Sequence, residues 1–256
     1  MKVLESVSVL LKRHAWLAVF SVTLALSLFP VGYWASRICL VFSSVGLWIW
    51  GAFLLRRRRL LSLAVFTTGF TVIGWFCLPG PSGDPAVLRQ AYVTCLKEYE
   101  GTRYVWGGEN RFGIDCSGLV RKGFILANIR TGVLTLNPCL VRAGLDLWWH
   151  DCTATALRDG YRSYTVRIAQ VQTINEISAD STLPGDLAIT TDGSHVLAYL
   201  GNKTWIEADP NEMKVLIIET PSDRAWFRTP VHLVRWHHLL DDSRLFNRDR
   251  ILMFNK

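Results

Sequence analysis

The chain has 256 residues, of which 50% are hydrophobic, and it carries a formal net charge of +7. The excess charge is local, because residues 1–60 hold eight basic residues and one acidic residue, whereas the other 196 residues hold 20 of each sign. Charge placed between apolar segments indicates membrane topology, and its distribution excludes a broad basic surface for nucleic acid on the rest of the chain.

Three apolar runs near the N-terminus account for the high hydrophobic share. They cover residues 15–33, 38–55 and 60–78, and each has 18 or 19 residues, close to the roughly 20 that a helix needs to span hydrocarbon. A cleaved signal peptide is the alternative for the first run, but no clear small-residue cleavage site follows it and two more runs do. We therefore predict three transmembrane helices in contact with membrane lipid.

Basic residues predict the orientation of these helices. Lys2, Lys12 and Arg13 hold the N-terminus in the cytoplasm, and four arginines at 56–59 keep the second turn on the same side. Three crossings then place everything after Pro79 outside the cytoplasm.

Residues 79–85 are predicted to be a short linker rich in proline and glycine. Asp84-Pro85 is a typical helix start, and the apolar residues that follow keep helical spacing up to Gly101. We expect one domain over residues 86–238, and the tail at 239–256 is assigned no structure.

The most informative stretch runs from Tyr104 to Val120. Its sequence is YVWGGENRFGIDCSGLV, in which an aromatic segment, a Gly-Gly break and a polar turn lead to Cys116 and an apolar run. We predict a loop that delivers Cys116 to the first turn of a helix reaching about Asn128. The free N–H groups and positive dipole of a helix N-terminus favour a thiolate, which is the nucleophilic form. The alternative is that Cys116 is a small buried residue of the core.

The rest of the domain changes from helix to strand. Residues 139–157 are predicted to be helical, and short strands follow, separated by glycine-containing breaks. The predicted strands are 186–190, 195–200, 204–208, 214–219 and 232–236. Helices followed by an antiparallel meander make an α+β fold. The cysteines imply no disulfide framework; one bridge among Cys95, Cys139 and Cys152 stays open, and buried free thiols are the favoured interpretation.

His195 is the best candidate among six histidines for a base beside Cys116. It begins a predicted apolar strand after a tight turn, so its ring can reach the edge of a sheet that packs on the Cys116 helix. The other histidines are interpreted as surface or core residues. Neither Cys-x-x-Cys nor His-Glu-x-x-His occurs, so the sequence indicates no metal site, and no cofactor motif is found.

Three strings of residues carry a family resemblance. Tyr-x-Trp-Gly-Gly at 104–108 with Asp-Cys-Ser-Gly-Leu-Val at 115–120, Leu-Pro-Gly-Asp-Leu at 183–187, and Ser-His-Val-Leu-Ala-Tyr-Leu-Gly at 194–201 together resemble the NlpC/P60 cysteine peptidases. These are papain-like enzymes that cut bacterial cell-wall peptides. The resemblance covers about residues 86–236, in the family's order of cysteine, Pro-Gly-Asp and histidine.

The resemblance implies further roles. In this family a His, Asn or Gln on the next strand orients the histidine, and the matching position is Glu207, with Asp209 on the same face as its competitor. Tyr104, Asp115 and Ser117 match residues that shape the peptide-binding groove. Asp115 would then bind a substrate ammonium, and Ser117 would bind a substrate carboxylate or carbonyl. The alternatives are that Tyr104 is a structural residue at the end of a strand and that Asp115 and Ser117 form a helix cap.

The resulting hypothesis is a peptidoglycan endopeptidase anchored in the bacterial cytoplasmic (inner) membrane, with its catalytic domain outside. Cys116 would attack the peptide, His195 would transfer the proton, and Glu207 would orient His195. Two alternatives stay open. One is an inactive peptidoglycan-binding module, favoured by the unusual Glu207, and the other is an amidase or acyltransferase on the same fold.

Overall fold

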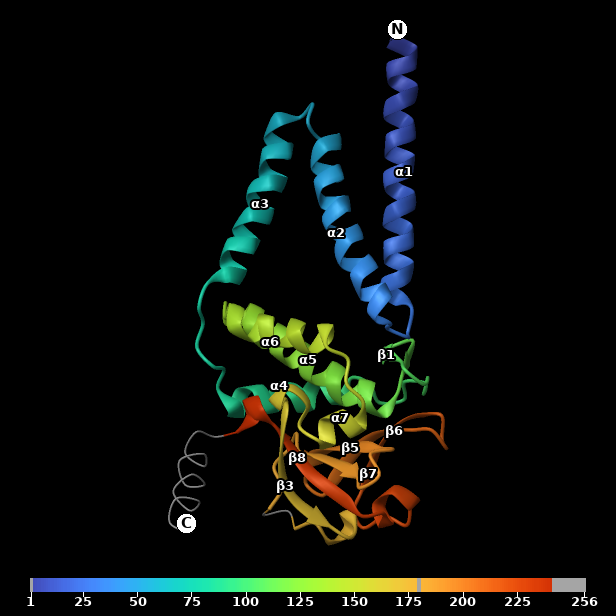
Figure 1. Ribbon diagram of the computed structural model, residues 1–256, viewed down its shortest axis with the longest axis vertical. Coiled ribbons are helices and arrows are strands. Elements are labelled where there is room, and N and C mark those ends of the chain that lie inside the picture. Colours follow the sequence, from blue (N-terminus) through green and yellow to red (C-terminus); the bar gives the residue numbers. More distant parts are fainter. Residues whose placement is uncertain (1, 179–180, 241–256) are drawn as a thin grey trace. The chain divides into compact units, whose positions relative to one another are not determined.

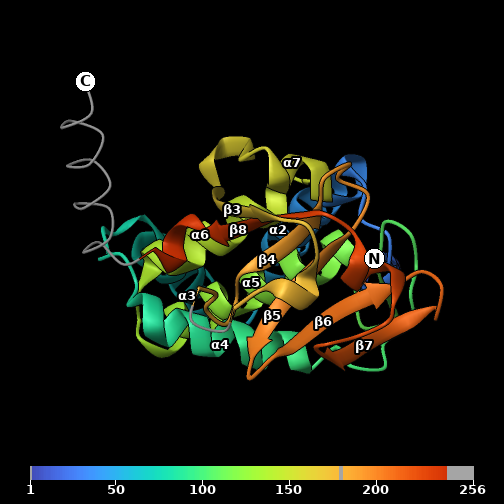
Figure 2. The same ribbon diagram turned by 90° about the horizontal axis from the view of Figure 1, so that it is seen from below.

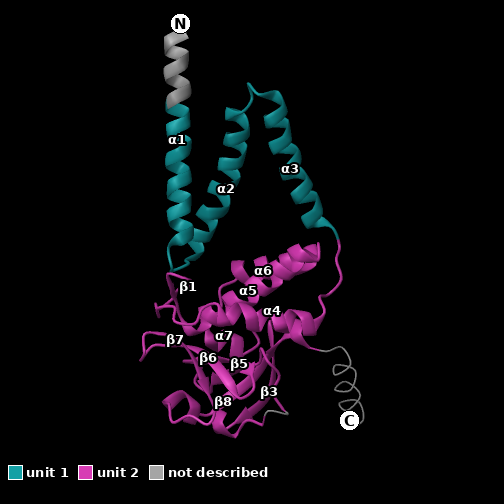
Figure 3. Ribbon diagram, turned by 180° about the vertical axis from the view of Figure 1, so that it is seen from behind, with its two compact units in different colours: residues 1–78 teal, residues 79–256 magenta. Residues whose placement is uncertain are grey.

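The computed structural model describes residues 2–178 and 181–240. Contacts between Cα atoms divide the chain into two compact units, residues 1–78 and residues 79–256 (Figure 3). Most of the C-terminal tail, residues 241–256, lies outside the described part of the chain.

The described residues of the N-terminal unit form the helices α1 (Lys2–Leu28), α2 (Trp34–Leu54) and α3 (Arg59–Cys77). Among the described residues, only α2 and α3 are long and apolar enough to cross a membrane by length and composition, which makes two such helices and not the three predicted. The extent predicted for the first run, 15–33, is wrong. Helix α1 ends at Leu28, just before Pro30, which cannot continue the backbone hydrogen bonds of a helix.

Two tryptophans join these helices to one another. Trp16 on α1 donates its indole N–H to the carbonyl of Leu47 on α2 (3.1 Å), and Trp48 on α2 donates to the carbonyl of Val65 on α3 (3.3 Å). Trp48 also lies against Gly69, where any side chain would collide with the indole. Both indole N–H groups are thereby satisfied within the unit, as tryptophan in an apolar environment requires.

The C-terminal unit packs helices on a six-stranded sheet (Figures 1 and 2). The helices are α4 (Pro85–Lys97), α5 (Cys116–Leu134), α6 (Pro138–Trp149) and α7 (Ala154–Arg158). The sheet strands are β3 (Thr165–Val171), β4 (Leu187–Thr190), β5 (Val196–Gly201), β6 (Thr204–Asp209), β7 (Lys214–Glu219) and β8 (Val231–Trp236). A small hairpin, β1 (Glu109–Asn110) with β2 (Gly113–Ile114), precedes α5. Short 3-10 helices are η1 (Tyr161–Ser163), η2 (Ile174–Glu176), η3 (Ala225–Arg228) and η4 (His237–Leu239).

Every strand pair in the sheet is antiparallel, and the strand order is β3-β8-β4-β5-β6-β7. The predicted α+β class with helices and an antiparallel sheet is therefore confirmed. The five predicted strands correspond to β4–β8 to within one residue at each end. Strand β3 was not predicted, because it lies at the sheet edge and its side chains are mostly half-buried or exposed, which weakens the apolar pattern of a strand.

The single helix predicted over residues 139–157 is wrong, because the structure has two helices there. Helix α6 ends at Trp149, and His150 adopts an extended backbone. Thr153 then caps α7 and accepts a hydrogen bond from the N–H of Ala156 (3.2 Å). A threonine that accepts from the backbone in this way starts a new helix and competes with continuation of the previous one.

Aromatic rings fill the space between the helices and the sheet. Phe124 on α5 stacks on Trp236 of β8 with ring centroids 4.5 Å apart, and Tyr92 of α4 meets both rings edge-on. A second apolar cluster, which includes the buried Trp205 and Phe227, lies on the opposite face of the sheet. Burial on both faces fixes the register of the strands, and with it the position of side chains at the strand ends.

A buried ion pair joins the turn before β4 to β8. Both oxygens of Asp186 accept hydrogen bonds from Arg235 (2.6 and 2.7 Å), and Asp186 also accepts from the N–H of Leu183 (2.8 Å). Both side chains are buried. This two-bond geometry is the strong form of a carboxylate–guanidinium contact, so it fastens two neighbouring strands that are far apart in the sequence.

Candidate active site

Asp115 and Cys116 lie at the start of α5, which continues beyond the predicted end of the helix. Oδ1 of Asp115 accepts hydrogen bonds from the Gly118 N–H (2.6 Å) and the Ser117 hydroxyl (3.0 Å). Its Oδ2 accepts from the N–H of Gly107 in the preceding loop (2.8 Å). Asp115 is therefore the helix cap, and Cys116 occupies the first helical position, where N–H groups lack partners within the helix and negative charge is favoured.

A close approach of two backbone segments holds this loop on α5. A Cβ atom at Gly118 would lie 2.1 Å from the carbonyl oxygen of Gly108, so only glycine fits there. The same Gly108 carbonyl accepts a hydrogen bond from the N–H of Asp115 (3.1 Å). The loop and the first turn of the helix thus form one fixed support for Cys116.

His195 lies immediately before β5 and faces Cys116. Its backbone N–H donates to Thr190 Oγ1 (3.0 Å), which ties it to the end of β4. Its ring Nε2–H donates to Oε2 of Glu207 on β6 (2.7 Å). Nδ1 is then the ring nitrogen that remains for an interaction with the Cys116 side chain.

The surroundings of His195 favour its protonated form. Burial by itself lowers the pKa of His195, but hydrogen bonds to Cys116 and Glu207, together with the negative charges of these groups, raise it to about 9. The protonated imidazole of His195 therefore lies beside the Cys116 side chain. Such a pair supplies a nucleophile and a proton donor in one contact.

The two acidic residues of β6 have different partners. Glu207 is fully buried and contacts His195. Asp209 is buried too, but it accepts from the Asn211 N–H (2.7 Å) and from Arg224 (3.1 Å). Glu207, and not its competitor Asp209, is therefore the carboxylate in hydrogen-bond contact with His195.

Cys116 and His195 open into one cleft of about 560 Å³. Five of the six residues singled out from the sequence line this cleft, namely Tyr104, Asp115, Cys116, Ser117 and His195, and Glu207 contacts His195 from β6. Burial, and then the negative charges of Cys116, Asp115 and Asp209, raise the pKa of Tyr104. The Tyr104 hydroxyl therefore stays protonated and can donate a hydrogen bond to a substrate oxygen.

The cleft also contains residues that the sequence did not single out as functional. Trp106 lines it and is 82% exposed. Trp226 of η3 stacks on the His195 ring, with 4.3 Å between centroids and 17° between planes. Arg121, which lies on α5 like Cys116, is buried and forms ion pairs with Glu109 and Asp151. Trp106 belongs to a visible motif, but no local pattern places residue 226 beside residue 195, because that contact depends on the tertiary fold.

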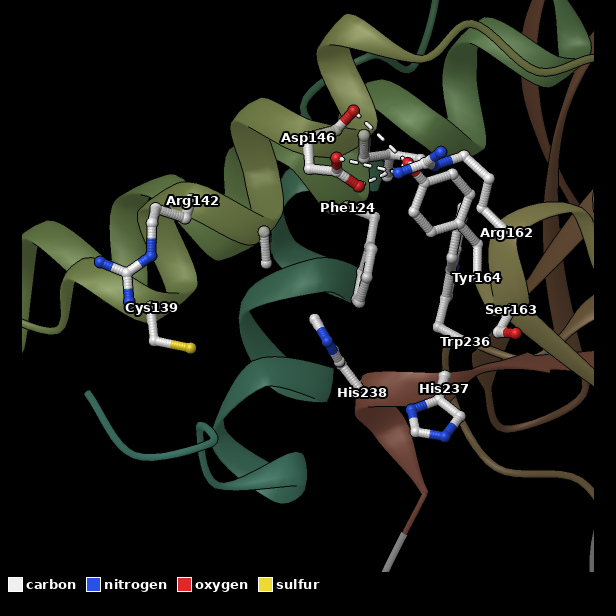
Figure 4. Close-up of a pocket in the computed structure, with 12 residues that line it drawn as sticks. Phe124, Cys139, Arg142, Asp146, Arg162, Ser163, Tyr164, Trp236, His237 and His238 are labelled. Carbon is white, nitrogen blue, oxygen red and sulfur yellow. Dashed lines mark hydrogen bonds and ion pairs between the residues drawn. The ribbon is translucent and has the colours of Figure 1, made fainter. Parts of the chain in front are cut away.

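A second pocket, of about 460 Å³, lies between α6 and the end of β8 (Figure 4). Figure 4 shows Arg162 and Tyr164 beside the carboxylate of Asp146, which accepts a hydrogen bond from the Tyr164 hydroxyl (2.6 Å). His237 and His238 line this pocket, but none of the six residues predicted for catalysis or substrate binding does. The first cleft is therefore the candidate active site.

Residues 101–235 match the family model described as the NlpC/P60 family. Similar solved structures include NlpC2 from Trichomonas vaginalis, with 21% identity over 64% of this chain and 50% of that chain and a TM-score of 0.39. The P60 domain of an antigen from M. avium subspecies paratuberculosis has 21% identity over 61% of this chain and 98% of that chain, with a TM-score of 0.37.

The peptidoglycan hydrolase RipB from Mycobacterium tuberculosis is similar as well, with 21% identity over 60% of this chain and 72% of that chain and a TM-score of 0.38. This chain spans half or slightly less of the length of the two Trichomonas vaginalis proteins, NlpC1 and NlpC2. No curated protein sequence matches this chain.

Proposed function

Because the chain belongs to the NlpC/P60 family, whose members are generally peptidoglycan hydrolases, we propose that it is a cysteine endopeptidase that cleaves stem or cross-bridge peptides of peptidoglycan. One observation carries the proposal. Cys116 stands at the start of α5, in the same cleft as a His195 ring that Glu207 holds in place.

In the proposed reaction, the Cys116 thiolate attacks the carbonyl carbon of the scissile bond, and the carbonyl oxygen becomes an oxyanion. The Cys116 N–H at the start of α5 and the Tyr104 hydroxyl are the candidate donors to that oxygen. His195 gives its proton to the leaving amine, and an acyl-enzyme remains. His195 then takes a proton from water, which attacks the acyl carbon and releases the carboxylic acid product and the cysteine.

Glu207 departs from the His, Asn or Gln that the family resemblance implies, but its contacts suit the same task. Its hydrogen bond to Nε2 orients the ring and leaves Nδ1 for Cys116. Its negative charge stabilises the imidazolium, which a neutral amide would do less well. These contacts favour an active enzyme over an inactive peptidoglycan-binding module.

We further propose that the N-terminal unit anchors the protein in the bacterial cytoplasmic membrane, with the catalytic domain outside. The apolar helices α2 and α3 support the anchor, and the four arginines at 56–59, between these two helices, support the orientation. A tag fused after the C-terminus should be accessible only from outside the cytoplasm, and a tag accessible only from inside would contradict this topology.

The test of function is digestion of purified peptidoglycan by the full-length protein in detergent, with the products identified by mass spectrometry. Fragments cut within the stem or cross-bridge peptide would support the proposal. Release of whole stem peptides from the glycan would identify an amidase, and transfer of an acyl group to an added amine would identify an acyltransferase. Binding without any release would identify the inactive module.

Replacing Glu207 with glutamine should move the alkaline limb of activity to lower pH. The wild-type enzyme loses its proton donor as the pH rises through the pKa of His195, about 9. Glutamine can still accept the Nε2–H bond but carries no charge, so the pKa of His195 falls and the limb moves down by about one pH unit or more. The measurement is kcat against pH for both proteins, and limbs at the same pH would contradict the role of the carboxylate charge.

A further inference from the structure

The indole of Trp226 covers one face of the His195 imidazole. The rings are nearly parallel, with 17° between planes and 4.3 Å between centroids. The same indole lines the cleft that contains Cys116. Trp226 lies on η3, in the connection between β7 and β8, so the contact exists only if this connection is held against the sheet.

Hydrogen bonds hold the connection on both sides of Trp226. Asn175 of η2 exchanges two hydrogen bonds with the backbone of Ser222 (2.9 Å each). The Thr173 hydroxyl donates to the carbonyl of Phe227 (2.5 Å), and the Phe227 ring is fully buried. The position of the indole is thus fixed by neighbours on each side of it.

An ion pair ties the same connection to β6. Arg224 lies 3.1 Å from Asp209 and 3.3 Å from Glu212. Asp209 is buried, whereas the side chain of Glu212 is 46% exposed. Asp209 and Glu207 are two positions apart on one strand and point to the same face. Strand β6 therefore contacts the His195 ring through Glu207, and through Asp209 it holds the connection that carries Trp226.

We propose that Trp226 is a positioning residue for His195 and that Asp209, acting through Arg224, holds Trp226 in place. The inference rests on the proposed cysteine-peptidase function. The flat indole restricts rotation of the imidazole and keeps water from its hydrogen bond with Glu207, and an aromatic face attracts a protonated ring. The titratable groups that face the ring are Cys116 from α5 and Glu207 from β6.

The test compares four variants of the full-length protein: W226A, W226F, D209N and E212Q. W226A should lower kcat on peptidoglycan peptides by about tenfold or more, because a base that can rotate is often out of line with the sulfur. It should also lower the pH at which His195 titrates by about half a unit, because the protonated ring loses its aromatic neighbour. W226F keeps a flat aromatic face, so it should keep most of the wild-type kcat and most of the wild-type titration pH of His195. D209N should lower kcat and the titration pH of His195, as W226A does. E212Q should match the wild type in both quantities, because an exposed ion pair contributes little.

Two readouts separate this inference from the proposed function. Titration of the His195 ring by nitrogen NMR needs no substrate, whereas kcat does. Wild-type protein that cleaves no peptidoglycan peptide would overturn the function. Active wild-type protein, together with a W226A variant that has unchanged kcat and unchanged His195 titration, would overturn the positioning role alone. A W226A variant with lower kcat but unchanged titration, or a W226F variant as impaired as W226A, would also overturn it.

Discussion

Replacing Cys116 with alanine should reduce the release of peptide fragments from purified peptidoglycan by at least about a thousandfold. In the proposed reaction the Cys116 thiol forms the acyl-enzyme. Without this thiol, His195 has no nucleophile to activate. The helix cap at Asp115 and the close approach at Gly118 do not involve the Cys116 side chain, so the fold should survive the change. Fragment release is followed by mass spectrometry at equal protein concentration.

Cys152 provides a matched control within the same cleft. It lines the cleft and is buried like Cys116, and it interacts electrostatically with Arg121, whereas Cys116 interacts with His195. Cys152→Ala should therefore keep most of the activity. Loss of activity in C152A with retention in C116A would show that the nucleophile has been assigned to the wrong thiol.

Replacing Asp186 with alanine should destabilise the C-terminal unit by about 3–5 kcal/mol. The change would leave the buried Arg235 guanidinium without the carboxylate that accepts its two hydrogen bonds. It would also remove the acceptor for the Leu183 N–H in the turn before β4. Denaturant unfolding of the full-length protein, followed by the fluorescence of its buried tryptophans, measures the effect.

The exposed pair of Arg228 with Asp223 is the control for this prediction. Its carboxylate side chain is 94% exposed, and exposed ion pairs contribute little to stability. Asp223→Asn should leave the unfolding midpoint unchanged. Equal midpoints for D186A and wild type would show that the buried pair does not stabilise the unit.

The parts of the structure that could be predicted from the sequence are those with strong local signals. Glycine breaks and short apolar runs located β4–β8, Asp84-Pro85 marked the start of α4, and the loop before Cys116 marked the start of α5. Strand β3 was missed because its edge position leaves polar side chains along it. The break between α6 and α7 was missed because the sequence alone does not show that the Thr153 hydroxyl caps the start of α7.

The residues of the candidate site also fall into two groups, those that a local motif identifies and those that only the tertiary structure identifies. Cys116 and Tyr104 lie in one continuous motif, so they were visible without a fold. The choice between Glu207 and Asp209 was not, because both point to one face of β6 and only the tertiary structure gives them different partners. Trp226 had no local signal at all, since its role depends on a ring 31 positions earlier in the chain.

Strand β8 is the last strand of the described chain, yet it lies between β3 and β4. While the chain is being synthesised, β3 has no partner in the sheet and β4 exposes an open edge until residue 236 has emerged from the ribosome. Arg235, which neutralises the buried Asp186, arrives with the same strand. Assembly of the six-stranded sheet must therefore wait for nearly the whole described chain, so the nascent C-terminal unit leaves that edge open during the interval.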